Sequence, residues 1–62
     1  MKEQEIIDLM INSVNEDNRL FSKKMGMSDD QIEKSIADSQ NTIKYMMEKV
    51  YSRMVSANLI NL

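Results

Sequence analysis

Apolar residues recur at helical spacing along two stretches of this chain, one on each side of Gly26. In the first stretch, over about residues 2–25, Ile7, Val14 and Phe21 repeat every seven residues, as in a packed helix–helix seam. On a wheel of about 100° per residue, the same stripe also holds Met10, Ile11 and Met25. We therefore expect a helix whose apolar stripe packs against a second helix.

Polar residues at positions 15–18 interrupt this first stretch. Such residues favour caps and turns, and the wheel places Asp17 and Asn18 on the apolar stripe. Two interpretations stay open: a continuous or bent helix whose seam holds a polar residue that fixes register, or a break near 15–18. Because neither glycine nor proline stands there, we favour the continuous or bent helix.

The turn between the two stretches carries the strongest local signals. Basic residues precede Gly26, as at a helix C-terminus, and Ser28 with Gln31 forms a Ser-x-x-Gln capping box. We expect the second helix over about residues 29–57. Its apolar stripe holds Ile32, Ile36, Ile43, Met47, Val50, Met54 and Ala57.

The backbone has a single place to reverse, because the 62 residues contain one glycine and no proline. We predict an all-α fold, an antiparallel helical hairpin that forms one domain over residues 1–62 without a linker. The uncharged segment 58–62 is expected to fray or to pack against a neighbouring chain. Opposite charges are expected to meet at both ends, Glu3, Glu5 and Asp8 with Lys49 and Arg53, and Lys23 and Lys24 with Asp29, Asp30 and Glu33.

Self-association is the expected supplement to a small core, which rarely contributes more than about 3–5 kcal/mol. The chain has no cysteine for disulfides or thiolate metal sites, and no histidine for zinc binding or general-base catalysis. We therefore expect a homo-oligomeric helical bundle. The expected partner or oligomer contacts are the apolar residues left outside the stripes: Leu9, Leu20, Met46, Tyr51, Val55 and Leu59.

Charge and hydropathy narrow the class of partner. Ten acidic and eight basic residues give a net charge of -2, which does not suggest a polybasic binder of nucleic acid or membrane. No apolar run approaches the roughly 20 residues that span a bilayer, and the start lacks the pattern of a secretion signal. We expect a cytoplasmic protein without membrane contact. Its seven methionines favour a helix core or oligomer seam over an adaptable binding surface.

Residues 21–28, followed by Ile32, resemble the turn of helix-turn-helix DNA-binding domains. The resemblance covers about a dozen residues and implies a DNA-binding regulator. The helix that would enter the groove carries one Lys34 against four acids, which phosphate would repel. We favour an ordinary glycine-terminated helix followed by a capped one. The four acids are Asp29, Asp30, Glu33 and Asp38.

A second candidate site lies on the back of the long helix. Tyr45, Lys49, Arg53 and Ser56 recur at spacings of four, four and three and so share one face. An aromatic ring beside cations suits an anionic ligand with a base, such as a nucleotide or a short single strand. The simpler interpretation is a solvated helix face with a tyrosine at an oligomer rim.

No catalytic residue, metal site or cofactor is expected, because the serines lack an activating base and no phosphate or calcium loop occurs. We expect a non-enzymatic adaptor, inhibitor or regulator that binds another macromolecule, most readily a protein, as a homo-oligomer. Compact chains of this style are typical of regulators from phages and mobile elements. The alternatives are a protein that sequesters an anionic, nucleotide-like ligand at an oligomer interface and a helix-turn-helix-like DNA-binding regulator.

Overall fold

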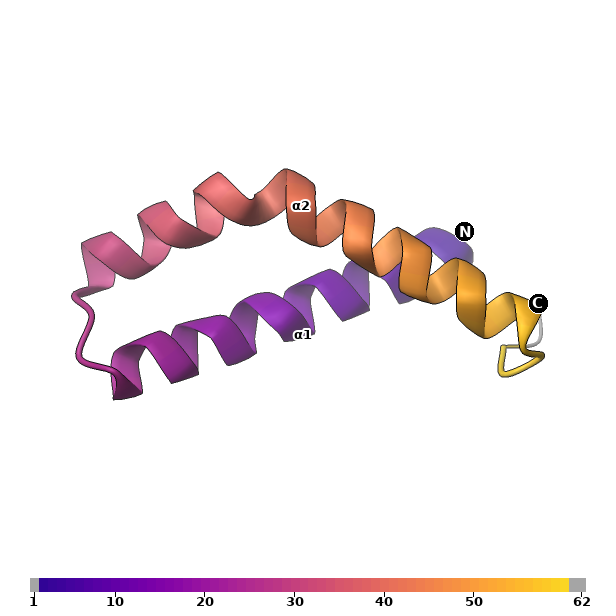
Figure 1. Cartoon of the computed structure of the whole chain (residues 1–62), viewed down its shortest axis with the longest axis horizontal. Coiled ribbons are helices and arrows are strands. Elements are labelled where there is room, and N and C mark those ends of the chain that lie inside the picture. The colour runs from indigo at the N-terminus through magenta and orange to yellow at the C-terminus, as the bar shows by residue number, and fades with distance from the viewer. Residues whose placement is uncertain (1, 61–62) are drawn as a thin grey trace.

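Two antiparallel helices make up the fold of this computed structural model, which describes residues 2–60. Helix α1 spans Lys2–Lys24 and helix α2 spans Asp29–Ser56. The start of α1 and the end of α2 lie at the same end of the molecule (Figure 1). The predicted all-α hairpin is confirmed, and both helices end one residue before the expected position. We call residues 19–33 the turn end, and residues 2–11 with 47–60 the free end.

Helix α1 is continuous through residues 15–18, which confirms the interpretation favoured from sequence. The polar residue in its seam is Asn15, which is 8% exposed. The expectation that Asp17 and Asn18 lie on the inward stripe is wrong, since both are exposed.

The contact between the helices shifts around α1 along its length. On α1 it passes from Ile7 to Ile11 and Asn15 in steps of four residues, and Ser22, seven residues further, is also half-buried. Crossing helices pack along such rows of residues four apart, and Figure 1 shows α1 passing behind α2 near the free end. Residues spaced by seven shift around a straight helix in the opposite direction, by about 20° for each heptad.

This rotation of the contact overturns four placements on the apolar stripes. Phe21 and Met25 are 64% and 67% exposed, because the inward side of α1 has turned away from them. Val50 on α2 and Ala57, which directly follows α2, are likewise exposed. The buried apolar core consists of Ile7, Ile32, Ile36, Ile43 and Tyr51.

The turn combines a signal that ends α1, at Gly26, with a signal that begins α2, at Ser28, as its sequence predicts. Gly26 has a φ of 90°, the left-handed conformation that glycine adopts most readily. Its N–H donates to the carbonyl of Lys23 (3.0 Å) and the N–H of Met27 to that of Ser22 (3.1 Å), which together make a Schellman motif. The Ser28–Gln31 capping box is confirmed, with both of its hydrogen bonds present.

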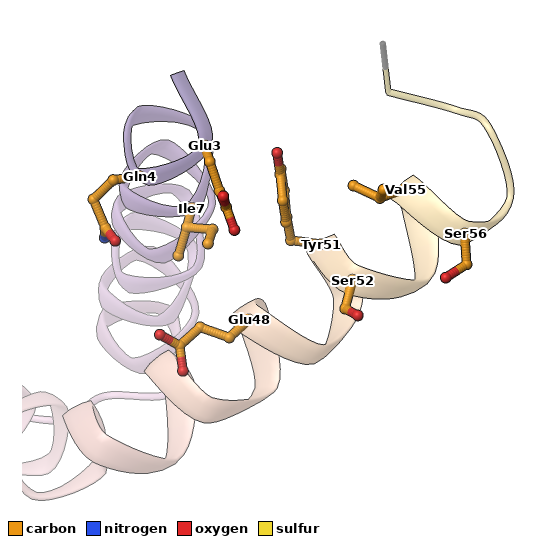
Figure 2. Close-up of a pocket in the computed structure, with 8 residues that line it drawn as sticks. All are labelled: Glu3, Gln4, Ile7, Glu48, Tyr51, Ser52, Val55 and Ser56. Atoms are coloured by element: carbon orange, nitrogen blue, oxygen red, sulfur yellow. The ribbon is translucent and has the colours of Figure 1, made fainter. Parts of the chain in front are cut away.

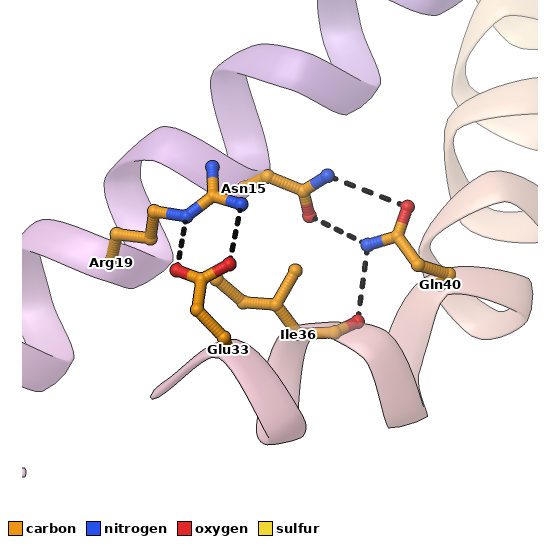
Figure 3. A network of polar contacts seen from close by, with 5 residues as sticks. All are labelled: Asn15, Arg19, Glu33, Ile36 and Gln40. Atoms are coloured by element: carbon orange, nitrogen blue, oxygen red, sulfur yellow. Dashed lines mark hydrogen bonds and ion pairs between the residues drawn. The ribbon is translucent and has the colours of Figure 1, made fainter. Parts of the chain in front are cut away.

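A polar clasp joins the middles of the two helices (Figure 3). Gln40 Nε2 donates to Asn15 Oδ1 at 3.2 Å, and Asn15 Nδ2 donates to Gln40 Oε1 at 3.5 Å. Gln40 Nε2 also donates to the backbone carbonyl of Ile36 at 3.1 Å. Because both amides are at least half-buried, pairing them in this register avoids the cost of unsatisfied polar groups.

The ion pair between the helices involves Arg19, whereas the expected pairs involved other basic residues. Arg19 Nε and Nη2 donate to the two carboxylate oxygens of Glu33 at 2.8 and 3.0 Å (Figure 3). Among residues 2–60, no pair between Glu3, Glu5 or Asp8 and Lys49 or Arg53, or between Lys23 or Lys24 and the acids of 29–33, comes within 4 Å. The rotated contact explains this result, because it brings Arg19 rather than the lysines beside α2.

Helix α2 ends in a second Schellman motif that its sequence did not predict. Asn58 adopts a φ of 60°, and its N–H donates to the carbonyl of Val55 at 3.0 Å. The N–H of Leu59 donates to the carbonyl of Met54 at 2.9 Å. Asparagine tolerates the left-handed conformation better than most residues, so Asn58 takes the role that Gly26 has in α1. Positions 61 and 62 of the segment expected to fray lie outside the described residues.

Candidate functional site

A groove of about 450 Å³ lies between the start of α1 and the last turns of α2, and we call it the free-end groove (Figure 2). It exists because the helices cross there, so that their side chains form two facing walls. Its lining is mixed, with carboxylates, hydroxyls and a carboxamide beside apolar side chains. The lining residues are Glu3, Gln4 and Ile7 of α1 and Glu48, Tyr51, Ser52, Val55 and Ser56 of α2.

Tyr51 is the central residue of this groove. Its side chain stands between the two helix ends (Figure 2), and the residue is 4% exposed. Within residues 2–60 its buried hydroxyl has no hydrogen-bond partner. Burial raises the pKa of Tyr51 above its ordinary value, and the negative charge of Glu3 raises it further. An unpaired buried hydroxyl is uncommon in folded proteins.

Both charged side chains that line the groove are acidic. Glu3 and Glu48 line the groove, and neither has a basic partner within 4 Å among residues 2–60. Gln4 donates its amide hydrogen to Asp8 at 2.8 Å, which leaves its carbonyl oxygen as an acceptor. The groove is therefore rich in acceptors and carries negative charge.

The tyrosine–cation face predicted from sequence is partly assembled. Lys49 Nζ lies 5.4 Å from the centre of the Tyr45 ring, within the range of a cation–π contact. These two residues line a shallow depression of about 410 Å³ together with Met46, Val50 and Arg53. Ser56, the fourth residue predicted for this face, lines the free-end groove instead.

Four of the six apolar residues predicted as partner or oligomer contacts are exposed, namely Leu9, Leu20, Met46 and Leu59. Val55 is half-buried. The expectation that Tyr51 remains outside the intramolecular core is wrong, because the contact on α2 rotates onto it near the free end. Sequence reasoning missed Phe21 and Met25 as exposed apolar residues, since it placed both in the core.

Metal binding and membrane insertion find no support in the described part of the chain. Within residues 2–60, no three acidic side chains gather in a way that could hold a metal ion. Neither α1 nor α2 contains a stretch apolar enough to cross a bilayer. Comparisons with protein-family models, with curated proteins and with solved structures find no match.

Proposed function

We propose that this chain is a non-enzymatic helical protein that self-associates through apolar side chains and, so assembled, binds another macromolecule as an adaptor, inhibitor or regulator. The observation that carries this proposal is the size of its exposed surface. The chain exposes 5041 Å², whereas a compact monomer of 7.2 kDa exposes about 4,100 Å². Its radius of gyration is 13.6 Å, against about 10.6 Å for a compact domain of this length.

The extra surface matches what one protein interface covers. The excess of about 900 Å² is close to the roughly 800 Å² that each partner buries in a standard interface. Much of the exposed side-chain surface is apolar on both helices, which favours burial against a second copy. The large exposed apolar residues are Leu9, Leu20, Phe21, Met25, Met27, Tyr45, Met46, Val50 and Leu59.

The two alternative functions have less support. Lys49 already lies over one face of the Tyr45 ring, so a base that stacks on that face has to displace it. In helix-turn-helix domains the two helices meet at about 90–120°, whereas α1 and α2 lie back along each other (Figure 1). We therefore favour binding of a protein over binding of a nucleotide or of DNA.

Sedimentation equilibrium tests self-association, and native mass spectrometry of protein recovered from its host tests for a bound partner. We expect the wild-type chain to be a dimer or larger at micromolar concentration. The double variant Leu20→Glu/Met46→Glu should be monomeric with its helical circular dichroism retained. Ser35→Glu, which also adds an acid at an exposed position of α2, is the matched control and should assemble as wild type does. A folded wild-type monomer at several hundred micromolar would contradict the proposal.

A further inference from the structure

We propose that the free-end groove binds the guanidinium group of an arginine side chain carried by a partner protein. This inference rests on the proposed function, because it assigns the chemistry by which the assembled chain recognises its partner. Three features of the groove support it: two carboxylates that have no basic partner among residues 2–60, a buried hydroxyl that has no hydrogen-bond partner there, and a lining that mixes apolar and polar side chains.

The charge of the groove selects a cation. The carboxylates of Glu3 and Glu48 line the groove from opposite helices, and no basic side chain within residues 2–60 lies within 4 Å of either. Holding two like charges across one groove is unfavourable, and a cation placed between them removes that repulsion. The net charge of -2 adds a weak, long-range attraction for a basic partner.

The Tyr51 hydroxyl is the second, independent indication of a ligand. Only 4% of the residue is exposed, and its hydroxyl has no hydrogen-bond partner among residues 2–60. Glu3, beside it at the mouth of the groove (Figure 2), is exposed and can move aside without losing a buried contact. A donor that enters between Glu3 and Tyr51 supplies the missing hydrogen bond and pairs the carboxylate at the same time.

Several features favour guanidinium over ammonium or a metal ion. The acceptors are spread over both walls, which suits the five N–H groups of a planar fork better than a point charge. Guanidinium is weakly hydrated, so it tolerates the apolar atoms that Ile7, Tyr51 and Val55 contribute to the lining better than an ammonium or a metal ion does. A groove of about 450 Å³ also exceeds what a bare ion fills, and its two carboxylates do not form a metal-binding cluster.

Nuclear magnetic resonance titration of the ¹⁵N-labelled protein tests this inference. The probe is Nα-acetyl-argininamide, and Nα-acetyl-citrullinamide is its uncharged isostere. We expect saturable shifts of the Gln4, Tyr51 and Ser52 amides with the arginine probe and none with the citrulline probe. Equal shifts with both probes, or arginine shifts spread over the acids of the turn end, would overturn the proposal. Equal affinity for Nα-acetyl-lysinamide would overturn the preference for guanidinium.

Two variants show whether the groove is the site. Glu48→Gln should weaken binding at least about fivefold, which corresponds to the loss of one charge-assisted hydrogen bond. Glu5→Gln is the matched control, because it removes the same charge from α1 at a position that does not line the groove. Tyr51→Phe keeps the ring and should also weaken binding. Equal effects of Glu5→Gln and Glu48→Gln, or wild-type affinity in Tyr51→Phe, would contradict the assignment.

The monomeric variant Leu20→Glu/Met46→Glu separates this inference from the proposed function. Neither substituted residue lines the groove, so the variant should bind the arginine probe as the wild-type chain does. Loss of arginine binding in a chain that still self-associates would overturn the inference alone. Arginine binding by a wild-type chain that never self-associates would overturn the proposed assembly alone.

Discussion

The turn end and the free end of the hairpin are held by different kinds of interaction. At the turn end, backbone hydrogen bonds around Gly26, the Ser28 capping box and the exposed Arg19–Glu33 pair fix the geometry. Ile32 is buried there, while larger apolar residues such as Phe21 remain in solvent. At the free end, Ile7 and Tyr51 are buried where the helices cross, and no ion pair joins residues 2–11 to residues 47–60.

The two ends also differ in which of their polar groups have a partner within the hairpin. The turn end satisfies the backbone groups around Gly26 and Ser28 through hydrogen bonds between neighbouring residues. Among residues 2–60, the free end leaves the Tyr51 hydroxyl without a hydrogen-bond partner and Glu3 and Glu48 without a basic partner. Unmatched polar groups beside a groove are typical of a surface that another molecule completes, whereas the exposed apolar groups at both ends fit self-association.

The largest expected effect is that of Ile7→Ala at the free end. It removes a buried side chain from a core in which no side chain is fully buried, so we expect a loss of about 2–3 kcal/mol. Chains of this size have only about 3–5 kcal/mol in total, and most of the helical signal should therefore be lost well below the wild-type melting temperature. Thermal and urea unfolding followed by circular dichroism measure the change.

Phe21→Ala at the turn end is the matched control for Ile7→Ala. It removes a larger side chain that is exposed, so its cost should stay within about 0.5 kcal/mol once unfolding is extrapolated to low protein concentration. A loss as large as that of Ile7→Ala in the dilute chain would show that the turn end also depends on apolar packing.

The clasp between the two ends gives the next largest effect. Asn15→Ala leaves the half-buried amide of Gln40 without its partner and should cost about 1–2 kcal/mol in urea unfolding. The double variant Asn15→Leu/Gln40→Leu should recover that loss or exceed the wild-type stability, while broadened NMR signals report a less unique register. If the double variant is as unstable as Asn15→Ala, the clasp stabilises the fold by more than the hydrogen bonds that its two amides give each other.

Gly26→Ala should cost about 1 kcal/mol in the same unfolding measurement. A Cβ at this position meets nothing within 4 Å, so the cost comes from the positive φ alone. Gly26→Asn is the matched variant and should lose less, because Asn58 already adopts this conformation at the end of α2. Equal losses for alanine and asparagine would indicate a cause other than backbone conformation.

Alkaline pH should weaken the free end selectively. Burial raises the folded-state pKa of Tyr51, so the stability gained from its neutral form is complete below the ordinary tyrosine pKa of about 10. That stability is lost as pH rises through the raised folded pKa. Urea unfolding at pH 8 to 11 should therefore show a decline that Tyr51→Phe reduces. An identical decline in Tyr51→Phe would argue that the hydroxyl is not buried.

Low pH should reduce the stability contributed by the turn end, and this is the smallest of the expected effects. The hydrogen bond from Arg19 lowers the folded-state pKa of the Glu33 carboxyl, with burial opposing and charge reinforcing the shift. The resulting stability is present above the ordinary glutamate pKa of about 4.3 and is lost as pH falls through the lowered value. Both side chains are about half exposed, so the change should be slight. Glu33→Gln should remove this loss of stability in acid, whereas Asp30→Asn, the matched control, should retain it.

The sequence predicts the turn end better than the free end for a physical reason. Ser28, Gln31 and Gly26 act through hydrogen bonds between residues close in the chain, so their pattern alone is sufficient. Burial of Tyr51 and exposure of Phe21 depend on how the helices cross, which rotates the contact away from the seven-residue repeat. The unpaired hydroxyl and the free-end groove follow from that crossing, so sequence reasoning did not find them.

Chemical modification of the two tyrosines tests the crossing most directly, because Tyr45 and Tyr51 are the only tyrosines in the chain. Limited nitration with tetranitromethane, mapped by peptide mass spectrometry, compares them within one molecule. We expect nitration of Tyr45, which is 61% exposed, and protection of Tyr51 in the folded chain, with both reacting in denaturant. Nitration of Tyr51 as fast as Tyr45 in the folded chain would contradict burial at the free end and the groove that depends on it.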